Sequence, residues 1–367
     1  PIIDAANEMK VALMTGRNAM EEFKGASSVI VDQVDQRELK QSIDDFEQSI
    51  VEFDSSIDAI LGGGTIGNGV VVFATDNVLL ANEVKLADKV HNEQFQPAAQ
   101  AMIAAGNMLI ASNSKQIKQT IVVEQLFITI VDLADKVETL IQKNADKSDA
   151  LIFSALVDAT MEIKVQILQS SLIIKTITQS STRLSVEQQK VHYDQTIVEF
   201  DALVSALLNG GMIDGALIPA LTNHEAISFI KKLDKVHQDF QSTTISLINI
   251  QLELIANSIT AKKAMERLDR TGALAAKHLE NIEEMSVSEM NEAIESADSA
   301  SVQALMTLLL TALFSVFIGA FLGWRTAVSI TRPLGGEPEQ MQQIAQKIAE
   351  GDLSDTIIVT GQEKGAY

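Results

Sequence analysis

The chain has 367 residues with 49 acidic and 28 basic side chains, so its formal net charge is −21. This balance argues against a nucleic-acid-binding protein, because phosphate contacts need a basic face. The absence of cysteine excludes disulfides, thiolate metal sites and cysteine nucleophiles. Five prolines and 4% aromatic residues favour long helices, because few helix breakers are present.

The apolar periodicity predicts an all-α protein with six helical segments before the membrane-spanning region ends. A first long helix is expected over about 5–61 and ends in "GGGTIGNG", which lacks the Lys of a phosphate loop and is interpreted as a flexible bend. A second helix runs to about residue 104, where Gly106 is expected to break it, and a third runs to about residue 143. A second long helix is expected over about 149–208.

The fifth and sixth segments complete the predicted helices. The fifth begins with a capping box in which Thr222 is followed three residues later by Glu225. The sixth runs from about residue 257 into an apolar segment. Each helix end is marked by glycine, proline or a capping residue, as helix termini usually are.

An internal duplication organises residues 1 to about 300. "QSIVEFDSSIDAILGGG" from Gln48 matches "QTIVEFDALVSALLNGG" from Gln195, and "LADKVHNEQFQ" from Leu86 matches "KLDKVHQDFQ" from Lys232. "NEMKVAL" from Asn7 is echoed by "MEIKVQIL" from Met161. The offsets differ slightly between the three pairs, and we expect small loop changes to absorb the difference. Two copies of one unit are therefore predicted, over about 5–145 and 149–300.

Helix lengths suggest how the two units are arranged. At about 1.5 Å per residue the long helices measure about 85 Å and the shorter ones about 50 Å. We therefore expect two stacked four-helix bundles that share the long helices at 5–61 and 149–208. This layout resembles the helical bimodular (HBM) sensing domain of chemoreceptors and some sensor kinases. The resemblance covers residues 1–300.

Residues 302–324 contain no charged side chain and are predicted to span a membrane. Twenty-three helical residues measure about 34 Å, which exceeds the roughly 30 Å hydrocarbon core. Trp324 suits the membrane interface, and Arg325 and Arg332 follow it, so the positive-inside rule places the C-terminal side in the cytoplasm. The protein is then expected in the inner (cell) membrane of a bacterium, with residues 1–300 extracytoplasmic. A first membrane helix is expected before Pro1.

Residues 325–367 are predicted to form part of a signal-relay module. Pro338 suits a first helical turn, an apolar stripe follows, and Gly351 is expected to end that helix. The stripe consists of Met341, Ile344, Ala345 and Ile348. "DLSDTIIV" is interpreted as an extended connector.

This order of elements resembles the first helix and connector of a HAMP domain. Pro333, Glu337 and "EGDLS" at 350–354 match the family pattern, and "RPLGGEPEQM" is similar to a segment of methyl-accepting chemotaxis receptors. Because a HAMP domain is a parallel four-helix bundle from two chains, the resemblance implies a homodimer. Relay roles are predicted for Trp324, Pro333, Glu337 and Gly351.

The HBM resemblance implies a small organic anion, such as a dicarboxylate or acetate, as ligand. An anion inside a bundle needs cationic side chains turned inward. Arg17 flanks the apolar face of its helix, whereas its counterpart in the second copy is Ser171. The predicted anion-binding residues in the membrane-near bundle are Arg17, Arg183, Lys190, His192, Lys235 and His237, and Lys89 and His91 are their far-bundle equivalents. The alternative is that these are solvated surface or packing residues.

The sequence thus predicts a chemotaxis receptor that senses a carboxylate outside the cell. Its partners would be a second copy, the membrane, and an adaptor and histidine kinase reached through further cytoplasmic residues. No enzymatic activity, cofactor, metal or nucleic acid is expected. Two alternatives stay open: a sensor histidine kinase with the same sensing domain, and a module that docks a periplasmic binding protein.

Overall fold

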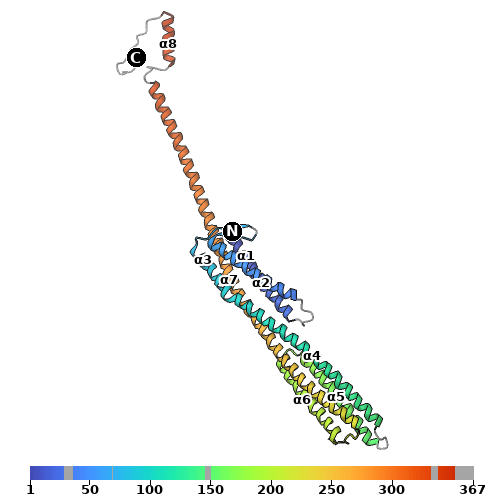
Figure 1. Ribbon diagram of the computed structural model, residues 1–367. Coiled ribbons are helices and arrows are strands. Elements are labelled where there is room, and N and C mark those ends of the chain that lie inside the picture. The colour runs from blue at the N-terminus through green and yellow to red at the C-terminus, as the bar shows by residue number, and fades with distance from the viewer. Residues whose placement is uncertain (29–35, 68, 145–149, 332–337, 352–367) are drawn as a thin grey trace. The chain divides into compact units, whose positions relative to one another are not determined.

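A computed structural model describes residues 1–28, 36–67, 69–144, 150–331 and 338–351 and confirms the all-α class (Figure 1). A π-helical turn, η2 (His91–Phe95), joins α3 to α4. The α-helices of the described residues are α1 (Ile2–Ser27), α2 (Gln36–Gly62), α3 (Val78–Val90), α4 (Gln96–Asn144), α5 (Ala150–Gln179), α6 (Arg183–Asn209), α7 (His224–Thr331) and α8 (Pro338–Ala349).

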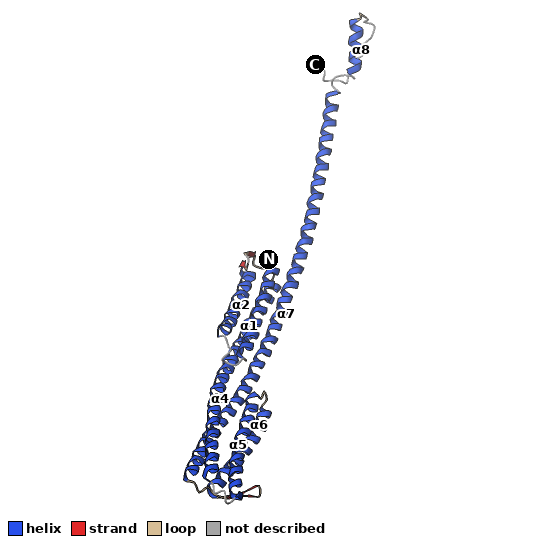
Figure 2. Cartoon of the chain, turned by 90° about the vertical axis from the view of Figure 1, so that its right-hand side faces the viewer, coloured by secondary structure: helices blue, strands red, loops and turns tan. Residues whose placement is uncertain are grey.

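The helices form two separate hydrophobic cores, one in each of two bundles (Figures 1 and 2). The first core combines α1, α2, α3, η2 and the start of α4 with residues 261–282 of α7. The second combines the end of α4 with α5, α6 and residues 226–255 of α7. We call these the first and second bundles; both lie in a compact unit, Pro1–Ser286, which is followed by a second unit, Val287–Tyr367.

The predicted stack of two four-helix bundles is therefore present, but the prediction of which helices are shared is wrong. The helices that contribute to both cores are α7 and the run from α3 through α4. The predicted long helix at 149–208 is two helices, because Thr182 caps α6 by accepting a hydrogen bond from Ser185 N at 3.2 Å. The predicted helix at 5–61 is likewise α1 and α2, each within the first bundle.

Gly106 does not break a helix as predicted. It lies inside α4, where a Cβ atom would be 2.4 Å from Cε1 of the buried Phe23 on α1. Its missing side chain allows two helices to approach closely. The predicted capping box of α7 is also wrong in its residue: the described cap is Asn223, whose Oδ1 accepts from Ala226 N at 2.9 Å.

The "GGGTIGNG" segment, predicted to be a flexible bend, contributes to a β-hairpin, and the segment that follows α6 forms a second one. Strands β1 (Gly64–Ile66) and β2 (Val70–Val72) pair antiparallel, as do β3 (Gly211–Ile213) and β4 (Ala216–Ile218). Asp214 and Gly215, at φ 50° and 84°, form the two-residue turn of the second hairpin, and Asp-Gly is a preferred pair for this geometry. Both hairpins follow the same helix of the repeated unit.

The repeat is visible in the structure, and η2 explains part of its uneven offset. His91 and His237 occupy equivalent positions, and so do Phe95 and Phe240, but the first pair of rings is separated by one more residue. The extra residue of the first copy between these rings is absorbed by the π-helical turn. The helix therefore keeps both aromatic rings on its core face. The turn of the first hairpin also has one residue more than that of the second, which confirms the predicted small loop change.

The second unit contains the remainder of α7 and α8. Residues 302–324 are helical and exposed, and α7 is long and apolar enough to cross a membrane by length and composition. Pro338 is the first residue of α8, as predicted. Gly351 follows its end at φ 82°, which confirms the predicted stop. Pro333, Glu337 and the predicted connector lie outside the described residues.

Candidate functional site

The structure does not bring the predicted cationic residues into one layer. Arg17, Lys89 and His91 belong to helices of the first bundle. The second bundle holds Arg183, Lys190, His192, Lys235 and His237 on α6 and the start of α7. The predicted grouping of Arg17 with this second set is wrong, because it assumed one long helix where the chain forms α5 and α6. The ligand-binding role of each residue stays a prediction.

Most of these cations face solvent. Lys190 contacts Asp194 at 2.6 Å and Arg183 contacts Glu187 at 2.7 Å, each one turn away on the same helix. Lys89 lies 3.9 Å from Glu93. Such exposed pairs contribute only a few tenths of a kcal/mol. His192 and Lys235 are also exposed, so this set forms no inward cationic cluster.

Arg17 flanks the core face as predicted and connects α1 to α7. Its Nε donates to Asp269 Oδ1 at 2.8 Å, and its Nη1 donates to Glu21 Oε2 at 3.0 Å. It lines a shallow groove together with Leu13, Met14 and Gly272. The guanidinium therefore crosses the groove between α1 and α7 in an ion pair, and its charge is already neutralised, while a cavity of about 330 Å³ remains beside it.

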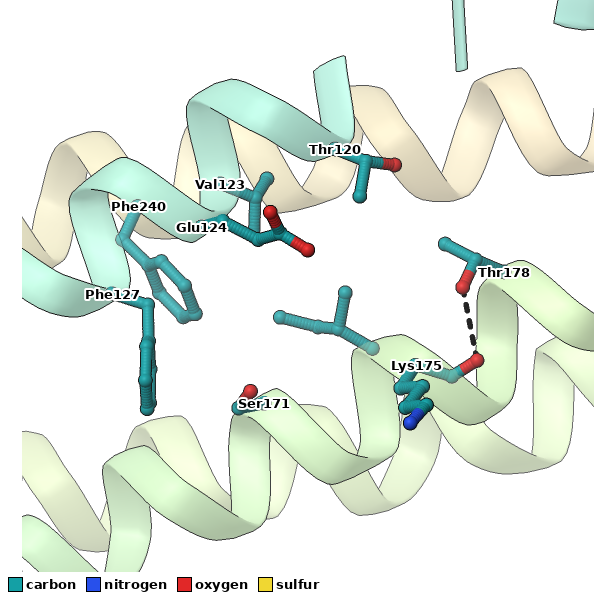
Figure 3. Close-up of a pocket in the computed structure, with 9 residues that line it drawn as sticks. Thr120, Val123, Glu124, Phe127, Ser171, Lys175, Thr178 and Phe240 are labelled. Carbon is teal, nitrogen blue, oxygen red and sulfur yellow. Dashed lines mark hydrogen bonds between the residues drawn. The ribbon is translucent and has the colours of Figure 1, made fainter. Parts of the chain in front are cut away.

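The equivalent groove of the second bundle has a serine where the first has Arg17. Ser171 on α5 stands where the first copy has Arg17, and a cavity of about 330 Å³ lies between α4 and α5 (Figure 3). Phe240 of α7 contributes to its wall. Sequence analysis missed this cavity, although the substitution of Arg17 by Ser171 was its signal. Residues that line it include Thr120, Glu124, Phe127, Ser171, Lys175 and Thr178.

A buried histidine is stacked on phenylalanine in each bundle. His91 lies 3.9 Å from Phe53 between ring centroids, and His237 lies 3.4 Å from Phe200. Each Nδ1 is 3.6 Å from a carboxylate oxygen, of Asp54 and Asp201 respectively. The shared "DKVH" segment thus places a histidine in each core, which agrees with the packing alternative.

Burial keeps both histidines neutral at pH 7. It lowers the pKa of His91 to about 4 and that of His237 to about 3. Burial also raises the pKa of the Asp54 and Asp201 carboxyls, and the nearby negative charges of Asp88 and Asp234 add to this rise. The contacts at 3.6 Å therefore join neutral imidazoles to carboxylates.

We expect these histidines to make the first unit sensitive to acid. Between pH 6.5 and the folded-state pKa the unfolded chain binds protons that the folded chain does not, so stability falls as pH falls. The slope is at most about 1.4 kcal/mol per pH unit for each histidine. Urea unfolding from pH 7.5 to 4.5 should show a steeper loss for the wild type than for the His91→Phe/His237→Phe variant. His192→Phe, at an exposed position, is the control; equal slopes for all three would contradict the assignment.

Among the predicted relay residues, Trp324 lies on α7 with its ring 6.2 Å from that of Phe321. Its position at the end of the uncharged segment suits a membrane interface. Gly351 ends α8. Within the described residues, no group of three His, Asp or Glu side chains could hold a metal ion.

No protein-family model and no curated protein match this sequence. Two solved structures of helical sensing domains are similar to 75% of this chain and are covered over 98% of their own length, at 9% identity. One is the sensor domain of the V. parahaemolyticus histidine kinase sensor TorS, with a TM-score of 0.44. The other is the TorS sensor domain in complex with TorT in the presence of TMAO, with a TM-score of 0.39. Similarity of this degree does not establish a family.

Proposed function

We propose that this chain is the sensing and membrane-crossing part of a transmembrane receptor, and that α7 carries the signal. The observation that supports this is the continuity of α7, a single helix of 108 residues. It contributes Ile230 and Leu247 to the second core and Leu268 and Leu279 to the first. The same helix then continues through the uncharged residues 302–324.

Polar contacts connect α7 to α1 and α3 of the first bundle at several positions along its length. Lys10 of α1 pairs with Glu283, and Glu83 of α3 accepts hydrogen bonds from His278 and Asn281 at 2.7 Å each. Arg17 adds its contact with Asp269. A stimulus that favours another packing of α1 or α3 would therefore shift α7 as well. The stimulus can shift this balance only by its difference in affinity between the two packings.

The positive-inside rule places Pro1–Ser286 outside the cell and α8 in the cytoplasm, where its resemblance to a HAMP helix supports a relay role. This arrangement is common to chemotaxis receptors and sensor histidine kinases, which the output domain distinguishes. A small ligand or a docked binding protein could each supply the stimulus. We expect no enzymatic activity of residues 1–367.

The relay can be tested by breaking α7 between the first unit and the predicted membrane span. Ala297→Pro removes a backbone N–H and clashes with the preceding turn, which costs about 3 kcal/mol in a helix interior. Ala297→Ser leaves the helix intact and is the control. Arg17→Glu places a carboxylate beside Asp269 and Glu21 and so substitutes for a stimulus.

In the full-length receptor, Arg17→Glu should change the phosphorylation level of the downstream kinase. Adding Ala297→Pro should abolish that change, whereas adding Ala297→Ser should preserve it. Thermal unfolding of the first unit should be the same in both Ala297 variants, because residue 297 lies outside its cores. An undiminished effect of Arg17→Glu in the proline variant would contradict transmission through α7.

A further inference from the structure

The lining of the cavity between α4 and α5 includes an exposed carboxylate. Glu124 of α4 points into the space between the helices (Figure 3). Among the residues that the structure describes, it makes no hydrogen bond or ion pair. Lys175 of α5 also lines the cavity, but its amine is turned away from the interior in Figure 3. The negative charge of Glu124 is therefore not neutralised by the protein.

The hydroxyls of the two threonines that line the cavity are acceptors. Thr178 Oγ1 donates its proton to Lys175 O at 2.9 Å, and Thr120 Oγ1 donates to Gln116 O at 2.9 Å. Each hydroxyl oxygen then has only lone pairs left. Together with Glu124, these groups call for a ligand that donates hydrogen bonds and carries positive charge.

Two phenylalanine rings form one end of the cavity. Phe240 is 1% exposed, and Phe127 lies beside it at the mouth (Figure 3). Aromatic faces attract ammonium groups electrostatically and also pack against apolar carbon. Val123 and Ile174 complete an apolar lining. The site thus combines one anionic group with an aromatic and aliphatic wall.

From this arrangement we propose that the cavity binds a small organic cation, an alkyl ammonium whose nitrogen pairs with Glu124 and whose carbon chain packs against Phe127 and Phe240. A volume of about 330 Å³ is at the small end of ligand pockets. The inference rests on the proposed receptor function for its biological role, because it names the ligand class of that sensor. It differs from the carboxylate that sequence resemblance implied.

The repeat provides a variant that adds a competing cation to the cavity. Ser171→Arg gives the second bundle the residue that the first bundle carries at the equivalent position. In the first bundle that arginine pairs with Asp269 across the groove. In the second bundle, the new guanidinium is expected to reach Glu124 and to occupy the position proposed for the ligand's ammonium group.

The probes are n-butylammonium, sodium butyrate and n-butanol, which share a carbon chain and differ in charge. Binding to the full chain in detergent micelles is followed by NMR of labelled valine and isoleucine methyl groups, with Val123 and Ile174 as reporters. Butylammonium should bind at least about tenfold more tightly than butyrate or butanol. Glu124→Gln should weaken it about tenfold, and Ser171→Arg should abolish the shifts of both reporters.

Two controls separate a ligand site from general attraction to an acidic protein. Glu266→Gln, on an exposed part of α7 in the first bundle, should leave butylammonium binding unchanged. Lys175→Gln should tighten it, because a positive charge at the cavity lining is removed. Equal binding of butyrate, equal losses in Glu124→Gln and Glu266→Gln, or no binding of any probe would overturn the proposal. The relay experiment with Arg17→Glu does not depend on this cavity, so the two failures are distinguishable.

Discussion

Replacing Phe53 or Phe200 with alanine is expected to lower the free energy of unfolding by about 3–5 kcal/mol in each case. Both rings are buried, at 0% and 1% exposure, and each stacks on the histidine of its own bundle. Truncation removes apolar contacts and leaves a cavity that the surrounding helices fill only in part. It also exposes one face of a neutral, buried imidazole to that cavity.

The repeat supplies matched controls two positions before each phenylalanine. Val51 and Val198 are 61% and 62% exposed, on the opposite face of α2 and α6. Val51→Ala and Val198→Ala should each change stability by less than about 0.5 kcal/mol. Urea unfolding followed by circular dichroism measures all four variants. Similar losses for the phenylalanine and valine variants would show that the assigned helix faces are wrong.

Gly106→Ala and Gly25→Ala are expected to change stability in opposite directions. Both glycines lie in helices, where alanine is favoured by up to about 1 kcal/mol. A Cβ at residue 25 meets nothing within 4 Å, so that variant should gain stability. At residue 106 it would meet Phe23 Cε1 at 2.4 Å, and the buried ring has little room to move. We expect a loss of about 1–3 kcal/mol there.

A second substitution tests whether Phe23 causes that loss. Phe23→Leu removes the ring atoms that the new methyl group would meet, so the Phe23→Leu/Gly106→Ala double variant should lose less than the sum of the two single variants. Thermal and urea unfolding of the four chains give the coupling free energy. Additive losses would mean that α1 and α4 do not approach as closely as described.

The helical class and the duplication could be predicted because both are local properties of the sequence. Apolar spacing defined the helices, and "VEFD" and "DKVH" occur once in each copy. The helix breaks were harder to predict. Gly106 is a poor helix former in isolation, yet close packing against Phe23 retains it within α4. At Thr182, by contrast, a side-chain cap starts a new helix where no glycine or proline marks the boundary.

The candidate sites depended on these breaks. Counting residues along an unbroken helix placed Arg17 beside Lys190, whereas the turn between α5 and α6 puts them in different bundles. The uneven offset of the repeat was seen in the sequence, but the accommodation of the extra residue near His91 by a π-helical turn depends on keeping Phe95 in the core. The cavity beside Glu124 depends on Phe240 from a third helix, and no local pattern reveals that contact.

The central claim is that α7 runs from an extracytoplasmic core through the membrane to a cytoplasmic helix. The chain has no cysteine, so single cysteines introduced by Ser301→Cys and Gln346→Cys can be labelled in intact cells with a membrane-impermeant maleimide. Both positions are exposed, on either side of residues 302–324. The account predicts labelling of Ser301→Cys in intact cells and of Gln346→Cys only after permeabilisation. Labelling of both variants from outside the cell would contradict it.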